Sequence, residues 1–302
     1  MTKHLLTFYT RTPLHVGCGT SVDVVDLPIM RERITGFPVV PGSSLKGVLL
    51  QHAREVFDSG KHARSSSTLP AEAKVLFGAV DTEGPDKKHV SNAGCIQIME
   101  AKLLAFPVRS LAGCFAWITC PAVLERFQRD TGKAFSVPQP NKSEVVAGTE
   151  LTVQQQVVFE EYPLTVINGS NVDDVAKALE ACTNDPLWTS KLKTRLAIVS
   201  DEMFQQFVTA CTEVVARIKI VPASRTVDGG ALFNQENIPC ETLFYSVLTV
   251  LASRRNSSES SSSPDELLEE LLPTKNAPLL QIGGDETTGH GICETKREVL
   301  NR

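Results

Sequence analysis

The 302-residue sequence lacks the segments that place a chain in a membrane or direct it out of the cell. No run of about 18 apolar residues is present, so no transmembrane helix is expected. The segment from Met1 to Tyr9 has neither a long apolar core nor a small-residue cleavage site, so it does not resemble a signal peptide. We therefore expect a cytoplasmic globular protein with no membrane partner.

Closely paired cysteines are also missing. The eight cysteines are spread over the chain, and none forms a Cys-x-x-Cys pair. Zinc sites and redox motifs usually need such pairs to fix the geometry of their thiols. In a reducing cytosol the thiols stay reduced, so we expect all eight to be structural or incidental.

The chain has no overall excess of positive charge, because its formal net charge is −5. Residues 1–54 differ, since they hold six Lys or Arg against three Asp or Glu, which gives a local charge of +3. A surface that binds polyanions needs local positive charge and not a basic whole protein. This end is the expected location of any such site, although a chance cluster of solvated charges is an equal alternative at this stage.

The N-terminal part of the chain predicts a strand, a long loop and a helix. Residues 4–9 are rich in β-forming side chains, and residues 10–42 are dense in proline and glycine. This density predicts a long ordered loop or small hairpins, which in compact domains are often functional. A helix should run from Ser43 to about Phe57, with Ser43 or Ser44 as its N-cap.

Periodicity and turn chemistry predict the remaining elements. Turn residues at 223–230 predict a β-hairpin over residues 213–233. Residues 136–148 should form a polar surface insertion, and the serine-rich residues 256–263 a flexible segment. Helices are expected at 70–77, 120–129, 171–182, 201–211 and 264–272, and strands at 95–105, 108–119, 151–160, 195–199, 213–221, 241–251 and 279–282.

Interspersed strands and helices without long βαβ units predict an α+β fold in one domain. The order of elements is that of a ferredoxin-like fold, β-α-β-β-α-β, with inserted segments. The sheets of RNA-recognition motifs share this order. The order alone is weak evidence for function, because many activities occur on this fold.

Three segments together resemble the RAMP proteins of CRISPR systems. They are 12–20 (TPLHVGCGT), 26–47, which ends in PGSSLKG, and 283–291 (GGDETTGHG). Residues 105–111 (AFPVRSL) and 114–117 (CFAW) resemble the backbone subunit of the type III-B, or Cmr, complex, the fourth subunit in its naming. The resemblance covers nearly the whole chain, and 26–47 is its most specific part.

The resemblance implies copies of the chain that polymerise head to tail along a guide crRNA, alongside other Cmr subunits. Each copy would have a ferredoxin-like palm and a thumb, and would cut the complementary target RNA once. Base pairing would read the sequence while the protein holds the backbone. The hairpin at 213–233 is the candidate thumb, with Arg217, Lys219 and Arg225 facing nucleic acid; an ordinary palm hairpin with solvated charges is the alternative.

The start of the helix after Pro41 is the first candidate RNA-binding segment. Exposed backbone N–H groups at a helix start favour a phosphate, Ser43 and Ser44 add hydroxyl donors, and Lys46 adds a point charge. Arg31 is a further expected contact in the same part of the chain. Without the resemblance, an ordinary capped helix with an exposed lysine would be the simpler interpretation.

The glycine-rich segment at 283–291 is the second candidate. Gly283, Gly284, Gly289 and Gly291 would let the backbone approach a ligand closely, and their N–H groups could form an anion nest. It is not a phosphate loop, since the Gly-Lys-Ser/Thr ending is absent. The resemblance implies a loop that packs beside the N-terminal loop and cradles guide RNA, whereas a plain hairpin turn is the alternative.

Asp26 is the predicted catalytic residue, because the corresponding aspartate is needed for target cleavage in the family. A carboxylate can position a divalent ion, expected to be Mg²⁺, or orient the ribose 2′-hydroxyl that attacks the adjacent phosphate. The alternative is an aspartate that caps the loop before Leu27 and Pro28. His15 is a candidate proton donor or acceptor, with a structural role as its alternative.

The stretch at 234–239 departs from the family. Relatives carry an acidic, tyrosine-containing stretch there, whereas this chain has Asn234-Gln235-Glu236-Asn237-Ile238-Pro239. Glu236 keeps an acid nearby and is a third candidate catalytic residue, but the tyrosine is absent. The leading hypothesis is therefore a guide-dependent endoribonuclease, and its rival is a scaffold that binds crRNA without cutting. A small-molecule enzyme on this fold finds no cofactor motif in the sequence.

Overall fold

The computed structural model describes residues 1–20, 24–58, 69–83, 88–167, 172–220, 223–225, 227–253, 262–276 and 278–300, and it confirms a mixed α+β fold. The helices are α1 (Gly42–Phe57), α2 (Ala71–Phe77), α3 (Pro121–Thr131), α4 (Asp173–Glu180), α5 (Pro186–Arg195), α6 (Asp201–Ala210), α7 (Pro264–Leu271) and the 3-10 turn η1 (Glu286–Thr288). The strands are β1 (Thr2–Thr10), β2 (Val39–Val40), β3 (Gly78–Glu83), β4 (Lys88–Ala93), β5 (Ile96–Ile98), β6 (Ala101–Arg109), β7 (Phe115–Thr119), β8 (Glu144–Ala147), β9 (Gln156–Phe159), β10 (Tyr162–Val166), β11 (Leu196–Val199), β12 (Glu213–Ile220), β13 (Val227–Asn237), β14 (Leu243–Val250), β15 (Leu279–Gln281) and β16 (Ile292–Leu300).

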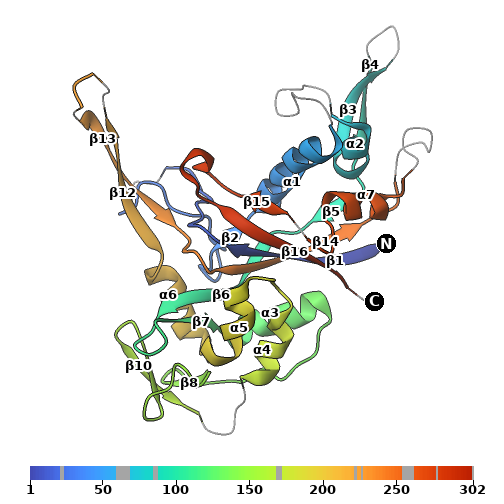
Figure 1. Cartoon of the computed structure of the whole chain (residues 1–302). Coiled ribbons are helices and arrows are strands. Elements are labelled where there is room, and N and C mark those ends of the chain that lie inside the picture. Colours follow the sequence, from blue (N-terminus) through green and yellow to red (C-terminus); the bar gives the residue numbers. More distant parts are fainter. Residues whose placement is uncertain are drawn as a thin grey trace.

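The main sheet runs in the order β15-β16-β1-β14-β6-β7-β11-β8-β10-β9. β1 lies between β14 and β16 and pairs antiparallel with both, so that Leu6 faces Ser246 on one side and Arg297 on the other. β6 pairs with β14 through its first half and with β7 through its second. β1 and β16, which lie near the two ends of the chain, are therefore neighbours within the sheet (Figure 1).

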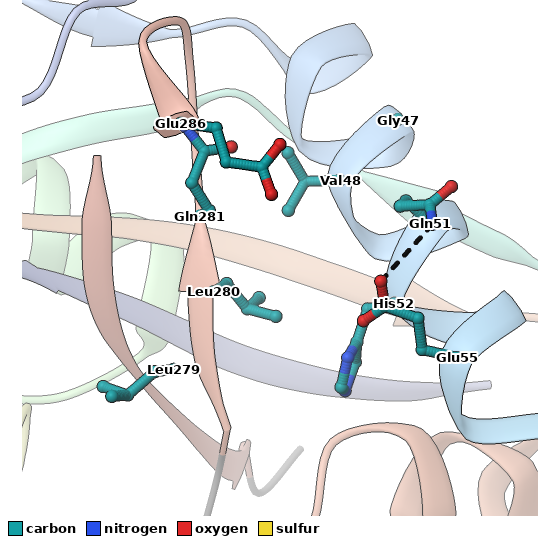
Figure 2. A pocket seen from close by; sticks show the side chains of 9 residues that line it. All are labelled: Gly47, Val48, Gln51, His52, Glu55, Leu279, Leu280, Gln281 and Glu286. Atoms are coloured by element: carbon teal, nitrogen blue, oxygen red, sulfur yellow. Dashed lines mark hydrogen bonds between the residues drawn. The ribbon is translucent and has the colours of Figure 1, made fainter. Parts of the chain in front are cut away.

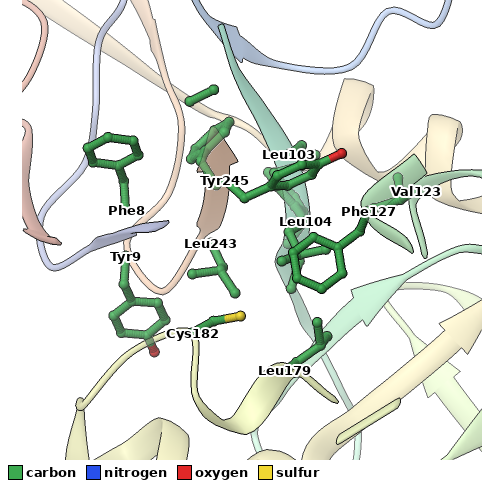
Figure 3. Close-up of a cluster of buried hydrophobic side chains, with 14 of the residues drawn as sticks. Phe8, Tyr9, Leu103, Leu104, Val123, Phe127, Leu179, Cys182, Leu243 and Tyr245 are labelled. Atoms are coloured by element: carbon green, nitrogen blue, oxygen red, sulfur yellow. The ribbon is translucent and has the colours of Figure 1, made fainter. Parts of the chain in front are cut away.

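The elements from β7 to α6 form a lobe beneath β16, β1 and β14, and the β12–β13 hairpin projects away from both (Figure 1). The fully buried rings of Trp117 on β7 and Trp188 on α5 meet edge to face, with centroids 5.0 Å apart, and Tyr9 of β1 meets Trp188 at 5.6 Å. Tyr9 and Leu179 point into one cluster from opposite sides (Figure 3). The lobe and the strands above it (β16, β1 and β14) thus share one hydrophobic core.

Helix starts were predicted with mixed success. α7 begins at Pro264, where a helix was predicted, and it starts with a capping box, because Ser263 and Glu266 exchange backbone and side-chain hydrogen bonds. α1 begins at Gly42 with Pro41 as its N-cap and makes no side-chain cap bond, so the prediction of Ser43 or Ser44 as the cap was wrong. A Cβ at Gly42 would lie 2.9 Å from the carbonyl of Ile98, so this helix start is fitted against neighbouring backbone.

The predicted break between strands at residues 106–107 was also wrong, because β6 continues through Pro107. The chain instead turns after Arg109, where Gly113 and Cys114 both have positive φ. At Pro107, β6 pairs on one side only, with Trp117 of β7, because its pairing with β14 ends at Ala105. A proline, which has no N–H, is tolerated at a position where one side of the strand is unpaired.

Some elements were missed. β8 lies within the expected surface insertion at 136–148, and β10, α5 and β16 were not predicted. β16 reads as a charged segment, yet Glu294 and Arg297 are buried in it. Their charges are matched by Arg11 and Glu269, so a segment with a polar sequence can form a strand inside the sheet.

Two expected absences can be compared with the structure. Among the described residues, no helix is long and apolar enough to cross a membrane. All eight cysteines are free thiols, and burial raises the pKa of Cys182 and Cys293 to about 12. Of the serine-rich segment, residues 256–261 lie outside the described residues.

Candidate functional site

Three segments that are distant in sequence meet at the root of the β12–β13 hairpin. The N-terminal loop, residues 12–38, bridges to β13 where Leu27 pairs with Gln235. The glycine loop, residues 283–291, reaches the same place through a backbone hydrogen bond to the carbonyl of His15. In its described residues, 12–20 and 24–38, the N-terminal loop is therefore ordered, as predicted, and the glycine loop packs beside it, as the resemblance implied.

Asp26 is exposed, and its carboxylate is placed by backbone contacts. The N–H of Asn234 on β13 donates to Asp26 Oδ2 at 2.7 Å. The N–H of Leu27 donates in return to the carbonyl of Asn234 at 3.0 Å. One carboxylate oxygen is thus fixed to β13 while the side chain as a whole stays open to solvent.

His15 is half-buried beside the same stretch of β13. Its Nδ1 lies 2.7 Å from the carbonyl oxygen of Glu236. A carbonyl can only accept, so Nδ1 carries the proton, and the neutral ring leaves the lone pair on Nε2 as an acceptor. A Cβ at Gly17 would come 2.6 Å from Nε2, so Gly17 provides the space for the ring.

Glu236 is buried and its carboxylate is fully occupied within the protein. Oε1 accepts from Arg31 at 2.5 Å and from Thr212 at 2.8 Å, and Oε2 accepts from the N–H of Ile29 at 3.0 Å. Arg31 also donates to the carbonyls of Gly36 and Val208. This geometry favours a structural role for Glu236 and Arg31, in place of the catalysis and RNA contact expected from the sequence.

The glycine loop needs glycine for close packing. Gly283 and Gly291 have φ of +81° and +74°, and a Cβ on them would lie 2.2 Å from the carbonyl of His15 and 1.9 Å from that of Ile282. The N–H groups of Gly284, Gly289 and Gly291 already donate to backbone carbonyls. These three amides are therefore engaged within the protein, and the anion nest stays a prediction.

The glycine loop contacts the hairpin through side chains that sequence reasoning did not connect. Asp285 Oδ2 accepts from Gln235 Nε2 of β13 at 2.5 Å and lies 3.0 Å from Arg217 Nη2 of β12. Arg217 Nη2 also lies 3.5 Å from His290 Nε2, and His290 Nδ1 contacts Thr288 at 3.0 Å. Arg217, expected to face nucleic acid, is thus engaged with the glycine loop.

The outer part of the hairpin is more open. Arg225 is exposed near its tip, whereas the side chain of Lys219 lies outside the described set. Paired Ile218 and Leu232 are 51% and 66% exposed, an apolar pair on a projecting element that the search for charged residues overlooked. Their alternation with polar neighbours was the sequence signal that could have indicated them.

The start of α1 carries exposed Ser43 and Lys46, with Ser44 half-buried. The same helix borders β15 across a groove of about 460 Å³ (Figure 2). Glu55 and Glu286 line this groove, and neither Lys nor Arg does. The two carboxylates make this groove unfavourable for a phosphate.

Residues 7–294 match the RAMP superfamily, so the chain belongs to this superfamily, as the three motifs indicated. The CRISPR system Cmr endoribonuclease Cmr4 of Pyrococcus furiosus is 38% identical over 309 residues, which is 100% of this chain and 98% of the relative. The CRISPR system CMR subunit Cmr4 of Saccharolobus solfataricus is 25% identical, over 94% of this chain and 93% of the relative.

Solved structures agree. The crystal structure of oligomeric Cmr4 from Pyrococcus furiosus has a TM-score of 0.72 at 32% identity, covering 100% of both chains. A chain of the type III-B Cmr-beta complex bound to cognate target RNA has a TM-score of 0.69 at 18% identity, covering 98% of this chain and 97% of that one, which shows the fold alone.

Proposed function

We propose that this chain is the backbone subunit of a type III-B CRISPR complex, which binds crRNA and cleaves complementary target RNA. The observation that carries the proposal is full-length similarity to a relative named as an endoribonuclease, at 38% identity. The oligomeric state named for a similar structure supports copies of the chain that assemble head to tail with other Cmr subunits. A heterologous interface of this kind extends until another subunit caps it.

The palm of this subunit is proposed to consist of β16, β1, β14 and β6 with α1 and α7. These neighbouring strands pair antiparallel throughout. A helix follows β1 and another follows β14 before the next palm strand, as in the β-α-β-β-α-β order. The lobe is then an insertion between β6 and β14, and the β12–β13 hairpin is the thumb.

RNA carries its own nucleophile, so the proposed site needs few groups. The 2′-hydroxyl oxygen forms a bond to the adjacent phosphorus as the bond from phosphorus to the 5′-oxygen breaks. Asp26 is proposed to orient that hydroxyl or accept its proton, and His15 Nε2 to serve as a second acceptor. A proton must return to the departing 5′-oxygen, and holding the two oxygens in line is the task of protein positioning.

A divalent ion, with Mg²⁺ as the expected one, is part of the proposal. Mg²⁺ keeps several waters and binds through one or two carboxylates and substrate phosphates, which fits an exposed Asp26. Among the described residues, no three or more His, Cys, Asp or Glu form a group that could hold a metal. Water and RNA would therefore complete the shell, and the bound ion would stabilise charge on the phosphate.

The guide is proposed to bind at the first turn of α1, through Ser43, Ser44 and Lys46. The exposed side chains of Ser43 and Lys46 and the unpaired amides typical of a helix start support this assignment. Arg225 near the thumb tip is proposed as a further contact, because it is exposed and cationic. For the glycine loop, backbone amides used internally support packing against the site over direct contact with phosphate.

The test is a complex reconstituted with crRNA, sister subunits and a labelled complementary RNA. Asp26→Asn keeps an oxygen for the N–H of Asn234 but removes the charge. It should bind target as wild type does and lose about 10²–10⁴-fold in single-turnover cleavage. Retained cutting by Asp26→Asn would refute the role of Asp26. Cutting by wild type without divalent ions would refute the role of a metal ion in cleavage. A wild type that binds target but never cuts it would indicate a scaffold.

A further inference from the structure

The glycine loop holds both strands of the thumb through one carboxylate. Asp285 Oδ2 accepts from Gln235 on β13 and pairs with Arg217 on β12. Arg217 faces Phe233 and Gln235 faces Val215 across the hairpin, so the two contacts are diagonal neighbours on one face. A single oxygen therefore joins the two strands where they leave the body of the protein.

Burial and backbone conformation indicate that this contact is a fixed part of the structure. Gln235 is 2% exposed, and the side chains of Arg217 and Asp285 are 22% and 29% exposed. Asp285 adopts a positive φ of 63°, a conformation that Asp and Asn accept more readily than most residues. Charge-assisted hydrogen bonds such as these are stronger and more directional than neutral ones.

The braced strand also carries the proposed catalytic groups. Within three consecutive residues of β13, the N–H of Asn234 holds Asp26, the side chain of Gln235 holds Asp285, and the carbonyl of Glu236 holds His15. A change in the position of Gln235 is therefore transmitted to both neighbours through one peptide bond each. A two-stranded hairpin is only marginally stable alone, so contacts at its root decide its orientation.

The opposite face of the thumb root is held by the N-terminal loop. Glu236 projects there and accepts from Arg31, Thr212 and the N–H of Ile29. Gln235 and Glu236 point to opposite faces of β13, because side chains alternate between faces along a strand. Asp285 therefore bonds Gln235 on the face opposite to the one where Glu236 bonds its partners. The root of the thumb is thus held between the two loops. On one face the carboxylate of Glu236 binds the N-terminal loop, and on the other the carboxylate of Asp285 binds the hairpin.

We propose that Asp285 is a positioning residue, through which the glycine loop fixes the thumb and the stretch of β13 that places Asp26 and His15. This inference rests on the proposed function, in which Asp26 cuts target RNA. It assigns the glycine-rich motif to bracing the thumb, whereas the resemblance implied that this loop cradles the guide.

The first experiment compares Asp285→Ala, Asp285→Asn and the matched control Glu286→Ala in the reconstituted complex. Glu286 is an acid of the same loop, but it faces the groove between α1 and β15 (Figure 2). Asp285→Ala should lower the single-turnover rate about tenfold or more, since a misplacement of about 1 Å can cost up to about 100-fold. Guide and target affinities should change less than about twofold, which is below about 0.5 kcal/mol.

Asp285→Asn keeps an acceptor for Gln235 and the positive φ, so it should recover part of the rate, whereas Glu286→Ala should match wild type. Two results would overturn the proposal. One is cleavage by Asp285→Ala at the wild-type rate. The other is a loss of guide affinity as large as the loss of rate, because the loop would then act on the guide directly.

A second experiment separates the brace from the cleavage activity. Hydrogen exchange of the full-length chain should show faster exchange in β12 and β13 of Asp285→Ala, with β1, β14 and β16 unchanged. Unchanged protection of β12 and β13 would overturn the brace, whatever the complex does. If protection falls but wild type never cuts, the brace stands and the proposed nuclease function fails.

Discussion

The root of the thumb and the junction between the lobe and the sheet are held by different kinds of contact. At the junction, the rings of Tyr9, Trp117 and Trp188 are fully buried against one another. At the root, Asp26 and Glu236 accept hydrogen bonds from groups on distant segments. Apolar burial gives most of the free energy of folding but little direction, whereas hydrogen bonds add little net free energy and fix atomic positions. Stability and cleavage should therefore respond to different mutations.

The largest effect on the free energy of unfolding is expected at the junction. Trp188→Ala removes a fully buried ring and should lower this free energy by about 3–5 kcal/mol, because a cavity remains between lobe and sheet. Equilibrium unfolding in urea measures it. The neighbouring Leu187, 37% exposed, is the control, and Leu187→Ala should cost less than about 1 kcal/mol. A comparable loss in both variants would contradict the difference between the regions.

A smaller loss is expected at the root. Glu236→Ala removes the carboxylate partner of Arg31 and the acceptor of the Ile29 N–H. It should lower the free energy of unfolding by about 1–3 kcal/mol, since Arg31 keeps the carbonyls of Gly36 and Val208 as acceptors. Glu236→Gln keeps the shape and should cost less and retain most of the cleavage. If Glu236→Gln is as stable as wild type yet fails to cut, Glu236 is catalytic, and the contacts at the thumb root do more than fix atomic positions.

The smallest effect is expected at a third buried polar contact, between His4 of β1 and Arg297 of β16. His4 is 2% exposed, and Arg297 Nη1 lies 3.0 Å from its Nδ1. Burial, and then the charge of Arg297, lower the pKa of His4 from 6.5. The unfolded chain then binds more protons than the folded one below this value, so stability should fall as pH drops through it.

Urea unfolding at about pH 7.5 and about pH 5.5 tests this expectation, because the two values bracket the ordinary titration of histidine. His4→Gln should lose less free energy of unfolding between the two values than wild type. An equal loss in both proteins would show that His4 does not contribute to the pH dependence.

The parts of the fold that were predicted from sequence are those specified locally. The helices at 201–211 and 264–272 and the hairpin over 213–233 each follow from patterns that lie within a few residues. β16 and α5 were missed for a physical reason. Glu294 in β16 is buried only because Arg11 and Thr183, far away in sequence, satisfy it.

The candidate site shows the same division. Asp26, His15 and the glycine loop were identified by their motifs, and the structure brings them to one place. The partners of Glu236 and Asp285 lie up to 207 residues away, so no local pattern could reveal them. The role of the glycine amides could not be predicted either, because their acceptors are backbone carbonyls set by the tertiary fold.

The alternation of contacts along the end of β13 limits how the hairpin can vary in length. Insertions at its tip, near Arg225, leave Asn234, Gln235 and Glu236 in register with their partners. Deleting one residue between Leu232 and Asn237 would instead turn each side chain to the opposite face. Glu236 would then meet Asp285, placing two carboxylates together. Natural relatives should therefore differ freely in thumb length at the tip and keep a constant spacing at the root.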